Sequence, residues 1–469
     1  MKKKNIGSRF LPVKIEYLFV ILGLLFGTIF NFTNPPWHTN DEDRHFYAAY
    51  SISDGQFVPE NKNNMSGTPL PRNLVGIVQS YQGIPYYQGS KLDKARMAPT
   101  LTMSLNEKDT VFVANPSLLS NPIPYIPHAI GIKLGKIIDS NPVALNHAGR
   151  IGGLLMFLII LFFAIRITPI FKSAFFLYGL TPMVLYQASS VTYDTLNIAF
   201  TFLILALCLK FAFQTEKLSR NDWILIVSML VLHRYSKDGY PLIPLLLLIV
   251  PAKKLGFEGI KSYAYYAGFA VFFIVLYFLP NWTWLKYVNS LELLPVAGGI
   301  KDFIYGSPTY LTKILSDPFE ATGNMISSTL FQRQDWMGGV IGRFGYSYSL
   351  MPKFFMIIHG IVLMSVAFFD SKSDIVFQWW QRLIIAITGL GTVALIIAGW
   401  YMASPLGSST IWGLQGRYFV PAVPIILLMF YNNKFENKFW TNWKGLIVSA
   451  YIIIALIYTI IFMNDAFYS

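Results

Sequence analysis

The sequence has little charge and almost no cysteine. Of its 469 residues, 13% are Asp, Glu, Lys or Arg, whereas soluble domains average about 25%. This scarcity excludes an ordinary soluble globule, which needs far more polar surface at this length. The one cysteine, Cys208, excludes an intramolecular disulfide and a cysteine-based metal cluster.

Apolar and aromatic residues take the place of the missing charge. The chain is 54% hydrophobic and 16% aromatic, and so many aromatic residues exclude intrinsic disorder. The net charge is +13, but Lys and Arg lie in short spacers between apolar runs instead of along one basic face. This distribution is typical of the positive-inside rule for membrane proteins. We therefore expect an integral membrane protein and no nucleic-acid partner.

The N-terminal segment resembles a signal peptide, with basic residues before an apolar run from Ile15 to about Phe32. The run is longer than a signal-peptide core of about 7–15 residues, and no small-residue cleavage site follows it. We expect a retained first membrane span with the N-terminus in the cytoplasm. The basic residues are Lys2, Lys3, Lys4, Arg9 and Lys14.

The remaining apolar runs predict an all-α polytopic membrane protein, a single integral membrane domain over residues 1–469. A large first extracytoplasmic loop is expected over 33–147 and a second outer segment over 280–350. Within the loop we expect a helix over 43–53, an interfacial segment over 122–138 and irregular structure around Pro69, Pro71, Gly83, Pro85 and Gly89. The total is about eleven spans, counted against a usual length of about 20 residues. Those after the first are expected near 148–165, 174–191, 195–213, a broken pair over 222–235 and 239–251, 263–279, 352–369, 383–402, 417–431 and 445–463.

Acidic residues and histidine gather directly after the first predicted span. Asn40 or Asp41 can cap a helix there, and Asp41 and His45 would share one of its faces. One interpretation is an acidic helix start favoured by the helix dipole. Another is a general base near the bilayer surface, Asp41 or Glu42, that takes a proton from an acceptor hydroxyl. A metal site with His38 is a third, although the spacing matches no established ligand pattern.

Four cations lie near predicted outer ends of spans, where the positive-inside rule does not explain them. Snorkelling to the interface accounts for any one of them. Together they indicate a shared anion, and phosphate is the obvious one carried by a lipid. Asp194, after Ser189 and Ser190, either caps a helix or belongs to the same site. The four cations are Arg150, Arg234, Lys237 and Arg417.

Four motifs in order resemble a bacterial family of predicted integral membrane proteins, domain of unknown function family 2142. The first is Asn40-Asp-Glu-Asp-Arg-His-Phe46, where the family usually has Pro in place of Asn40. The others are Leu180-Thr-Pro-Met-Val-Leu-Tyr-Gln-Ala-Ser-Ser-Val-Thr-Tyr-Asp194, Lys237-Asp-Gly-Tyr240 and Gly413-Leu-Gln-Gly-Arg-Tyr-Phe-Val-Pro421. They extend over most of the chain, and they add Tyr240 and Gln415 to the candidate site residues.

The resemblance implies a GT-C-like fold, as in glycosyltransferases that use a polyprenyl-phosphate sugar outside the cytoplasm. In such enzymes a carboxylate in the first outer loop is catalytic. The implied reaction moves a sugar to a cell-envelope glycan or a teichoic-acid-like polymer. Asp41 would be the base and Glu42 the reserve candidate, with His45 orienting Asp41 or binding the acceptor.

In this interpretation Lys237 and Arg417, with Arg150 and Arg234, would neutralise the donor phosphate. No cofactor is implied, and a divalent metal is not favoured. Two alternatives remain: a transporter or flippase of a lipid-linked or anionic envelope precursor, and a non-catalytic scaffold. The sugar, the acceptor and the stereochemistry are not specified by the sequence.

Overall fold

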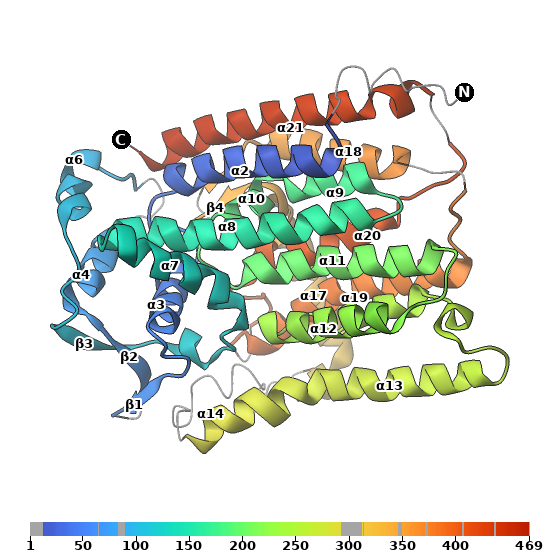
Figure 1. Cartoon of the computed structure of the whole chain (residues 1–469), viewed down its shortest axis with the longest axis horizontal. Helices are drawn as coiled ribbons and strands as arrows, with labels where there is room; N and C mark the ends of the chain where they lie inside the picture. Colours follow the sequence, from blue (N-terminus) through green and yellow to red (C-terminus); the bar gives the residue numbers. More distant parts are fainter. Residues whose placement is uncertain are drawn as a thin grey trace.

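The computed structural model describes residues 13–63, 65–82, 90–291, 312, 314–345, 349–370, 374–405, 408–435 and 438–468. The basic residues expected at the N-terminus before Lys14 lie outside this part of the chain. Most of what is described is helical, and most of the long helices run along a common direction (Figure 1). The prediction of a mostly helical membrane protein is confirmed, and two small sheets depart from the expected all-α class.

In the part of the chain that the structure describes, six helices are long and apolar enough to cross a membrane. Two shorter apolar helices, Lys353–Phe369 and Gly416–Leu428, accompany them in the described residues. The expected total of about eleven spans is not confirmed. The six are Ile15–Thr33, Pro142–Ile167, Asp194–Phe213, Lys261–Val288, Trp379–Ala403 and Asn442–Phe467.

Several predicted spans are broken or short, and prolines explain most of these breaks. The run expected over 174–191 is divided into α9 (Lys172–Gly179) and α10 (Pro182–Ala188), with Pro182 opening the second helix. The run near 239–251 contains a 3₁₀ helix, η4 (Ile243–Ile249). The run near 417–431 becomes η7 (Gly416–Ala422) and α20 (Val423–Leu428).

The bundle is organised around α11 (Asp194–Phe213), which is buried on nearly every side. It packs against α8 (Pro142–Ile167), α12 (Arg220–Ser236) and η4, and α8 also packs against α2 (Ile15–Thr33). By contrast, α13 (Lys261–Pro280) exposes most of its apolar side chains, as expected of a helix that faces lipid. The other long helices are α17 (Pro318–Ile341), α18 (Lys353–Phe369), α19 (Trp379–Ala403) and α21 (Lys438–Phe467).

The segment expected to be the first extracytoplasmic loop forms a small α/β unit at one end of the bundle (Figure 1), called the outer unit after that expectation. Its helix α3 (Glu42–Ser53) confirms the expected helix over 43–53. Its antiparallel sheet has the order β1-β2-β3, with Gly67 opposite Ala114 and Pro71 opposite Thr110. The unit comprises α3, β1 (Glu60–Lys62), β2 (Met65–Pro71), α4 (Arg72–Tyr81), α6 (Lys94–Met97), η1 (Ala98–Thr102), β3 (Thr110–Ala114), η2 (Pro116–Leu119), η3 (Ile123–Tyr125) and α7 (Ile126–Ile138).

The sheet corrects the expectation of irregular structure at Pro69 and Pro71. Both prolines belong to β2, and β1 pairs only as far as Gly67. That part of β2 therefore has one partner strand, and the missing N–H groups of the prolines leave no ladder bond unmade. The other predicted irregular positions, Gly83, Pro85 and Gly89, lie outside the described residues.

Helix α7 lies directly on α8 and fixes the outer unit to the bundle. A Cβ atom at Gly131 would lie 2.2 Å from the carbonyl oxygen of Ala148, and one at Gly152 would lie 2.2 Å from that of Pro127. Only glycine permits so close an approach of the two backbones. The outer unit is therefore packed tightly on the helix that carries Arg150.

The second outer segment, expected over 280–350, contains more regular structure than a loop. It includes η6 (Asn281–Leu285), α14 (Lys286–Ser290), α17, β4 (Arg343–Phe344) and β5 (Ser349–Leu350). Helix α17 packs against η7, and Gln332 on α17 donates to the carbonyl of Ile411, 3.0 Å away. This contact supports the segment that carries Arg417.

Candidate functional site

Asp41 is the residue before α3, and its backbone is left-handed, with φ 59° and ψ 14°. Asp tolerates this conformation better than most side chains. The predicted helix start is confirmed, but the Asp41 side chain makes no capping hydrogen bond. Its Oδ2 instead accepts a hydrogen bond from Nη2 of Arg417 at 3.2 Å. The carboxylate therefore faces η7.

Glu42, the next residue, contacts α8 instead of η7 and is fully buried against Arg150. Nε and Nη2 of Arg150 each donate to one Glu42 oxygen at 2.7 Å. The remaining guanidinium hydrogens go to the carbonyls of Asn31, Asn34 and Pro35, at 2.7–2.8 Å. All five N–H donors of an arginine are thereby used.

The Glu42 carboxylate is equally occupied. Its Oε1 also accepts from the backbone N–H of Val191 at 3.0 Å, and its Oε2 from that of Thr39 at 3.2 Å. This pair joins the end of α2, the start of α3 and α8. It corresponds to two predicted site residues, the reserve base and a phosphate ligand, and the geometry gives both a structural position instead.

A second set of charges forms an open cluster, defined here as Asp41, Arg417, Asp194 and Lys237. Nη1 of Arg417 lies 3.7 Å from Oδ2 of Asp194, and Nζ of Lys237 lies 2.5 Å from Oδ1 of Asp194. The four side chains come from the α3 start, η7, the start of α11 and the end of α12. The structure therefore brings together two of the four predicted phosphate ligands.

Exposure differs sharply within the open cluster. The Asp41 side chain is 35% exposed, while those of Asp194 and Arg417 are each 4% exposed. Burial lowers the pKa of Lys237, and the neighbouring Asp194 carboxylate opposes that shift. Asp41 is therefore the carboxylate of the cluster that a solute can reach, and Asp194 supports the charge of Lys237.

Gln415 and Asn40 position Arg417. Oε1 of Gln415 accepts from Nε of Arg417 at 2.8 Å and from the side-chain amide of Asn40 at 2.7 Å. The carbonyl of Asn40 accepts from Nη1 of Arg417 at 3.3 Å. Asn40 stands where the family usually has Pro, and here its amide has a partner in the site.

Three tyrosines near the cluster, Tyr193, Tyr418 and Tyr125, were not predicted from the sequence. The ring centroids of Tyr193 and Tyr418 lie 4.4 Å and 4.6 Å from Nζ of Lys237, within the range of a cation–π contact. The sequence feature that could have identified Tyr193 and Tyr418 is their position next to Asp194 and Arg417 in two of the motifs. Tyr240, a predicted candidate, donates through its hydroxyl to the carbonyl of Tyr418 at 2.9 Å.

His45 lies beside the open cluster and is uncharged at neutral pH, because burial lowers its pKa to about 3. Its Nδ1 is 2.7 Å from the hydroxyl of Tyr125, the third tyrosine, and its ring centroid is 4.5 Å from that of Tyr193. Its Nε2 is buried and has no hydrogen-bond partner among the described residues. A neutral imidazole with one uncommitted nitrogen can orient a polar group beside Asp41.

Two other predictions are not brought into the cluster by the contacts observed. Arg234 pairs with Asp238 and donates to the carbonyl of Tyr277 on α13. His38 lies against Asn34 and Tyr186, 3.2 Å and 3.4 Å from Nδ1. In the described residues, no group of three or more His, Cys, Asp or Glu is arranged to hold a metal ion.

The comparisons with known proteins identify the class and no individual relative. Residues 24–429 match the family described as "Predicted membrane protein (DUF2142)", so the chain belongs to this family of multi-pass membrane proteins. Neither the curated proteins nor the solved structures contain a significant match.

Proposed function

We propose that this protein is a glycosyltransferase that moves a sugar from a polyprenyl-phosphate donor to a hydroxyl of an envelope glycan or a teichoic-acid-like polymer. The open cluster is the observation that supports this proposal. It combines a reachable carboxylate with two cations at one end of an apolar bundle. In the expected orientation this end is extracytoplasmic.

Asp41 is the general base of the proposed reaction. Its exposed carboxylate takes the proton of the acceptor hydroxyl while the acceptor oxygen forms a bond to the anomeric carbon of the donor. Glu42 is excluded from this role because it is fully buried and both of its oxygens accept hydrogen bonds. His45 is placed to orient the acceptor or Asp41 through its uncommitted Nε2.

Lys237 and Arg417 act on the leaving group. As the bond between the anomeric carbon and the phosphate oxygen breaks, its electron pair remains on the polyprenyl phosphate. Cations held in place before the reaction stabilise such developing charge most effectively. Asp194 holds both cations, and Gln415 sets the orientation of Arg417. Attack from the side opposite the phosphate inverts the anomeric centre.

The test is a transfer assay on the full chain in nanodiscs, with a panel of polyprenyl-phosphate hexoses and purified envelope polymer. We expect Asp41→Asn to lower the rate by about 10²–10⁴-fold, the usual contribution of a general base. Asp109→Asn is the matched control, since Asp109 is an exposed carboxylate of the outer unit whose ion pair with Arg72 is also exposed. Full activity of Asp41→Asn would show that the base is another group.

The same protein reconstituted in liposomes separates the proposal from a transporter. A glycosyltransferase releases sugar-free polyprenyl phosphate in step with the glycosylated acceptor. A flippase moves the intact lipid-linked sugar between leaflets of a liposome and breaks no bond. Movement without cleavage would replace the proposed function by that alternative.

A further inference from the structure

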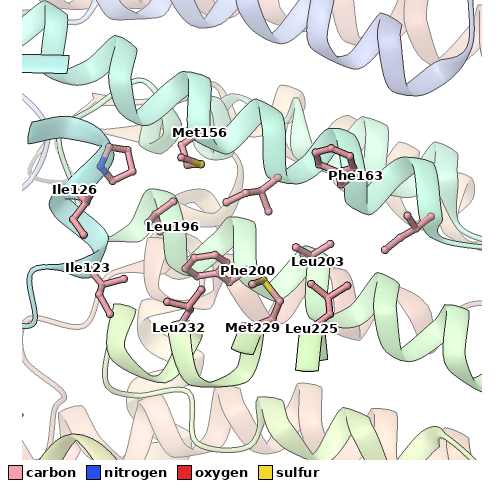
Figure 2. A pocket seen from close by; sticks show the side chains of 13 residues that line it. Ile123, Ile126, Met156, Phe163, Leu196, Phe200, Leu203, Leu225, Met229 and Leu232 are labelled. Atoms are coloured by element: carbon pink, nitrogen blue, oxygen red, sulfur yellow. The ribbon is translucent and has the colours of Figure 1, made fainter. Parts of the chain in front are cut away.

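An apolar groove runs along one side of the bundle between α8, α11 and α12 (Figure 2). Its volume is about 500 Å³, and every residue that lines it is apolar. The η3 turn and the first residues of α7 cover one end through Ile123, Ile126 and Pro127. A volume of this size is typical of a small-molecule site.

Each of the three helices contributes one continuous face to the groove. Side chains three and four positions apart lie on the same side of a helix, and α8 follows this spacing from Met156 to Ile167. Those eleven steps correspond to about 16 Å along the helix axis, roughly half of the hydrocarbon core of a bilayer, which is about 30 Å thick. The other two faces are Leu196, Phe200 and Leu203 on α11 and Leu225, Met229 and Leu232 on α12.

Along α11, α12 and η3 the covered end of the groove lies near residues of the open cluster, whereas α8 leads from Met156 towards Arg150, which pairs with Glu42. Leu196 follows Asp194 by two residues, and Leu232 precedes Lys237 by five. In η3, Tyr125 lies between the lining residues Ile123 and Ile126, and its hydroxyl contacts His45. An apolar channel with cations at one end is complementary to an amphiphile with one long chain and an anionic head.

We propose that the groove binds the isoprenoid chain of a polyprenyl phosphate, with the phosphate next to Lys237 and Arg417. This inference rests on the proposed function for the identity of the head group. The chain enters from the bilayer, because Phe163 and Leu225 leave 49% and 42% of their surfaces exposed along the groove. Met156 and Met229 are flexible, polarizable side chains that adapt to a branched chain.

The charge near one end of the groove favours a lipid with an anionic head group as its occupant. The open cluster supplies charge complementarity that an uncharged lipid would leave unused.

The test uses a sugar-free polyprenyl monophosphate with a photoreactive isoprene unit, added to the full chain in nanodiscs and mapped by peptide mass spectrometry. We expect labelled peptides from α8, α11 and α12. Met229→Trp, which fills the groove, should lower this labelling at least tenfold. Ile224→Trp is the control, since Ile224 is on the same helix, is 53% exposed and does not line the groove.

Three results would overturn the assignment: labelling spread evenly over exposed helices such as α13, equal labelling of the two tryptophan variants, or equal competition by phosphatidylglycerol and unlabelled polyprenyl phosphate. The last would show a general site for anionic bilayer lipid. Because the probe carries no sugar, its binding does not depend on transfer. Groove labelling in a protein without transferase activity would retain the lipid site and remove the proposed reaction, whereas transfer without groove labelling would do the reverse.

Discussion

Two arginine–carboxylate pairs tie the start of α3 to the bundle, and they differ in nearly every physical respect. In the closed pair, Arg150 and Glu42 are fully buried and all their hydrogen-bonding groups have partners. In the open cluster, Arg417 shares two carboxylates at 3.2 Å and 3.7 Å, and Asp41 remains partly exposed. The two carboxylates that meet these arginines are neighbours in sequence.

The difference shows how adjacent acidic residues acquire separate roles. A left-handed residue turns the chain sharply at Asp41, so Asp41 and Glu42 point to different helices. A buried pair with every bond made is costly to break and has nothing left to offer a ligand. A reachable carboxylate held by a shared arginine can exchange that partner for a substrate. Full burial and a complete set of hydrogen bonds distinguish the structural pair from the partly exposed candidate catalytic pair.

The largest expected effect comes from breaking the closed pair. Glu42→Gln leaves the Arg150 charge buried and unpaired, and we expect a loss of about 3–5 kcal/mol in the free energy of unfolding. Denaturant unfolding in detergent measures it. Asp109→Asn, which breaks the exposed pair with Arg72, should cost at most about 1 kcal/mol. Equal stability of the two variants would contradict the assigned role of the closed pair.

The second prediction removes the arginine of the open cluster. Arg417→Gln should lower the transfer rate by about 10²–10³-fold, as when one stabilising donor is lost from an active site. Its effect on unfolding should be much smaller than that of Glu42→Gln, because Lys237 still pairs with Asp194. Parallel rate and unfolding measurements check both halves. A loss of stability without a loss of rate would place Arg417 with the structural pair.

The third prediction concerns the support that Asp194 gives to Lys237. Burial lowers the pKa of Lys237 and Asp194 opposes this, so Asp194→Asn should lower that pKa further. A lysine is charged below its pKa, and phosphate binding by the variant should therefore weaken as pH rises and recover as pH falls. Each unit of pKa shift corresponds to a tenfold change in the ratio of charged to neutral lysine at a given pH.

Binding of polyprenyl phosphate between about pH 5.5 and 8.5 measures this effect. Lys237→Met is the control, because it removes the charge at every pH and should bind weakly throughout the range. A pH-independent loss in Asp194→Asn, like that of the control, would indicate that Asp194 acts only through geometry.

The smallest expected effect lies at the edge of the open cluster, at His45. Its folded-state pKa is about 3 against an ordinary 6.5, so the unfolded chain binds a proton as pH falls through about 6.5 while the folded chain does not. The free energy of unfolding therefore decreases as the pH is lowered below about 6.5, by up to about 1.4 kcal/mol per pH unit for one histidine. His45→Gln should remove this contribution, measured as the difference in unfolding free energy between about pH 7.5 and 5.5. An unchanged difference would contradict a buried, neutral His45.

Much of the fold was predictable because apolar runs and helix starts are local signals. The helices α3, α8, α11 and α19 lie close to their expected ranges. The number of spans was not predictable, because prolines and short 3₁₀ segments divide apolar runs within the bundle. The strand that contains Pro69 also escaped prediction, since one-sided pairing depends on where β1 ends.

The candidate site was predictable by residue type and only partly by arrangement. Asp41, Asp194, Lys237 and Arg417 meet as their shared end of the bundle suggested. The sequence did not distinguish Arg150 from Arg417, since only the fold shows which arginine has filled its hydrogen bonds. The groove had a local signal, the repeated three-and-four spacing on three helices, but its alignment beside the cluster needed tertiary structure.

The close crossing of α7 over α8 at Gly131 and Gly152 has a kinetic consequence. For the proposed lipid site, η3 and the first residues of α7 cover one end of the groove, so we expect the lipid chain to enter sideways, by diffusion within the membrane plane. The donor concentration that governs the proposed reaction would then be its mole fraction in the bilayer and not its amount per volume of buffer. We expect dilution of the vesicles with inert lipid to slow the proposed transfer, and dilution of the suspension with buffer to leave donor capture unchanged.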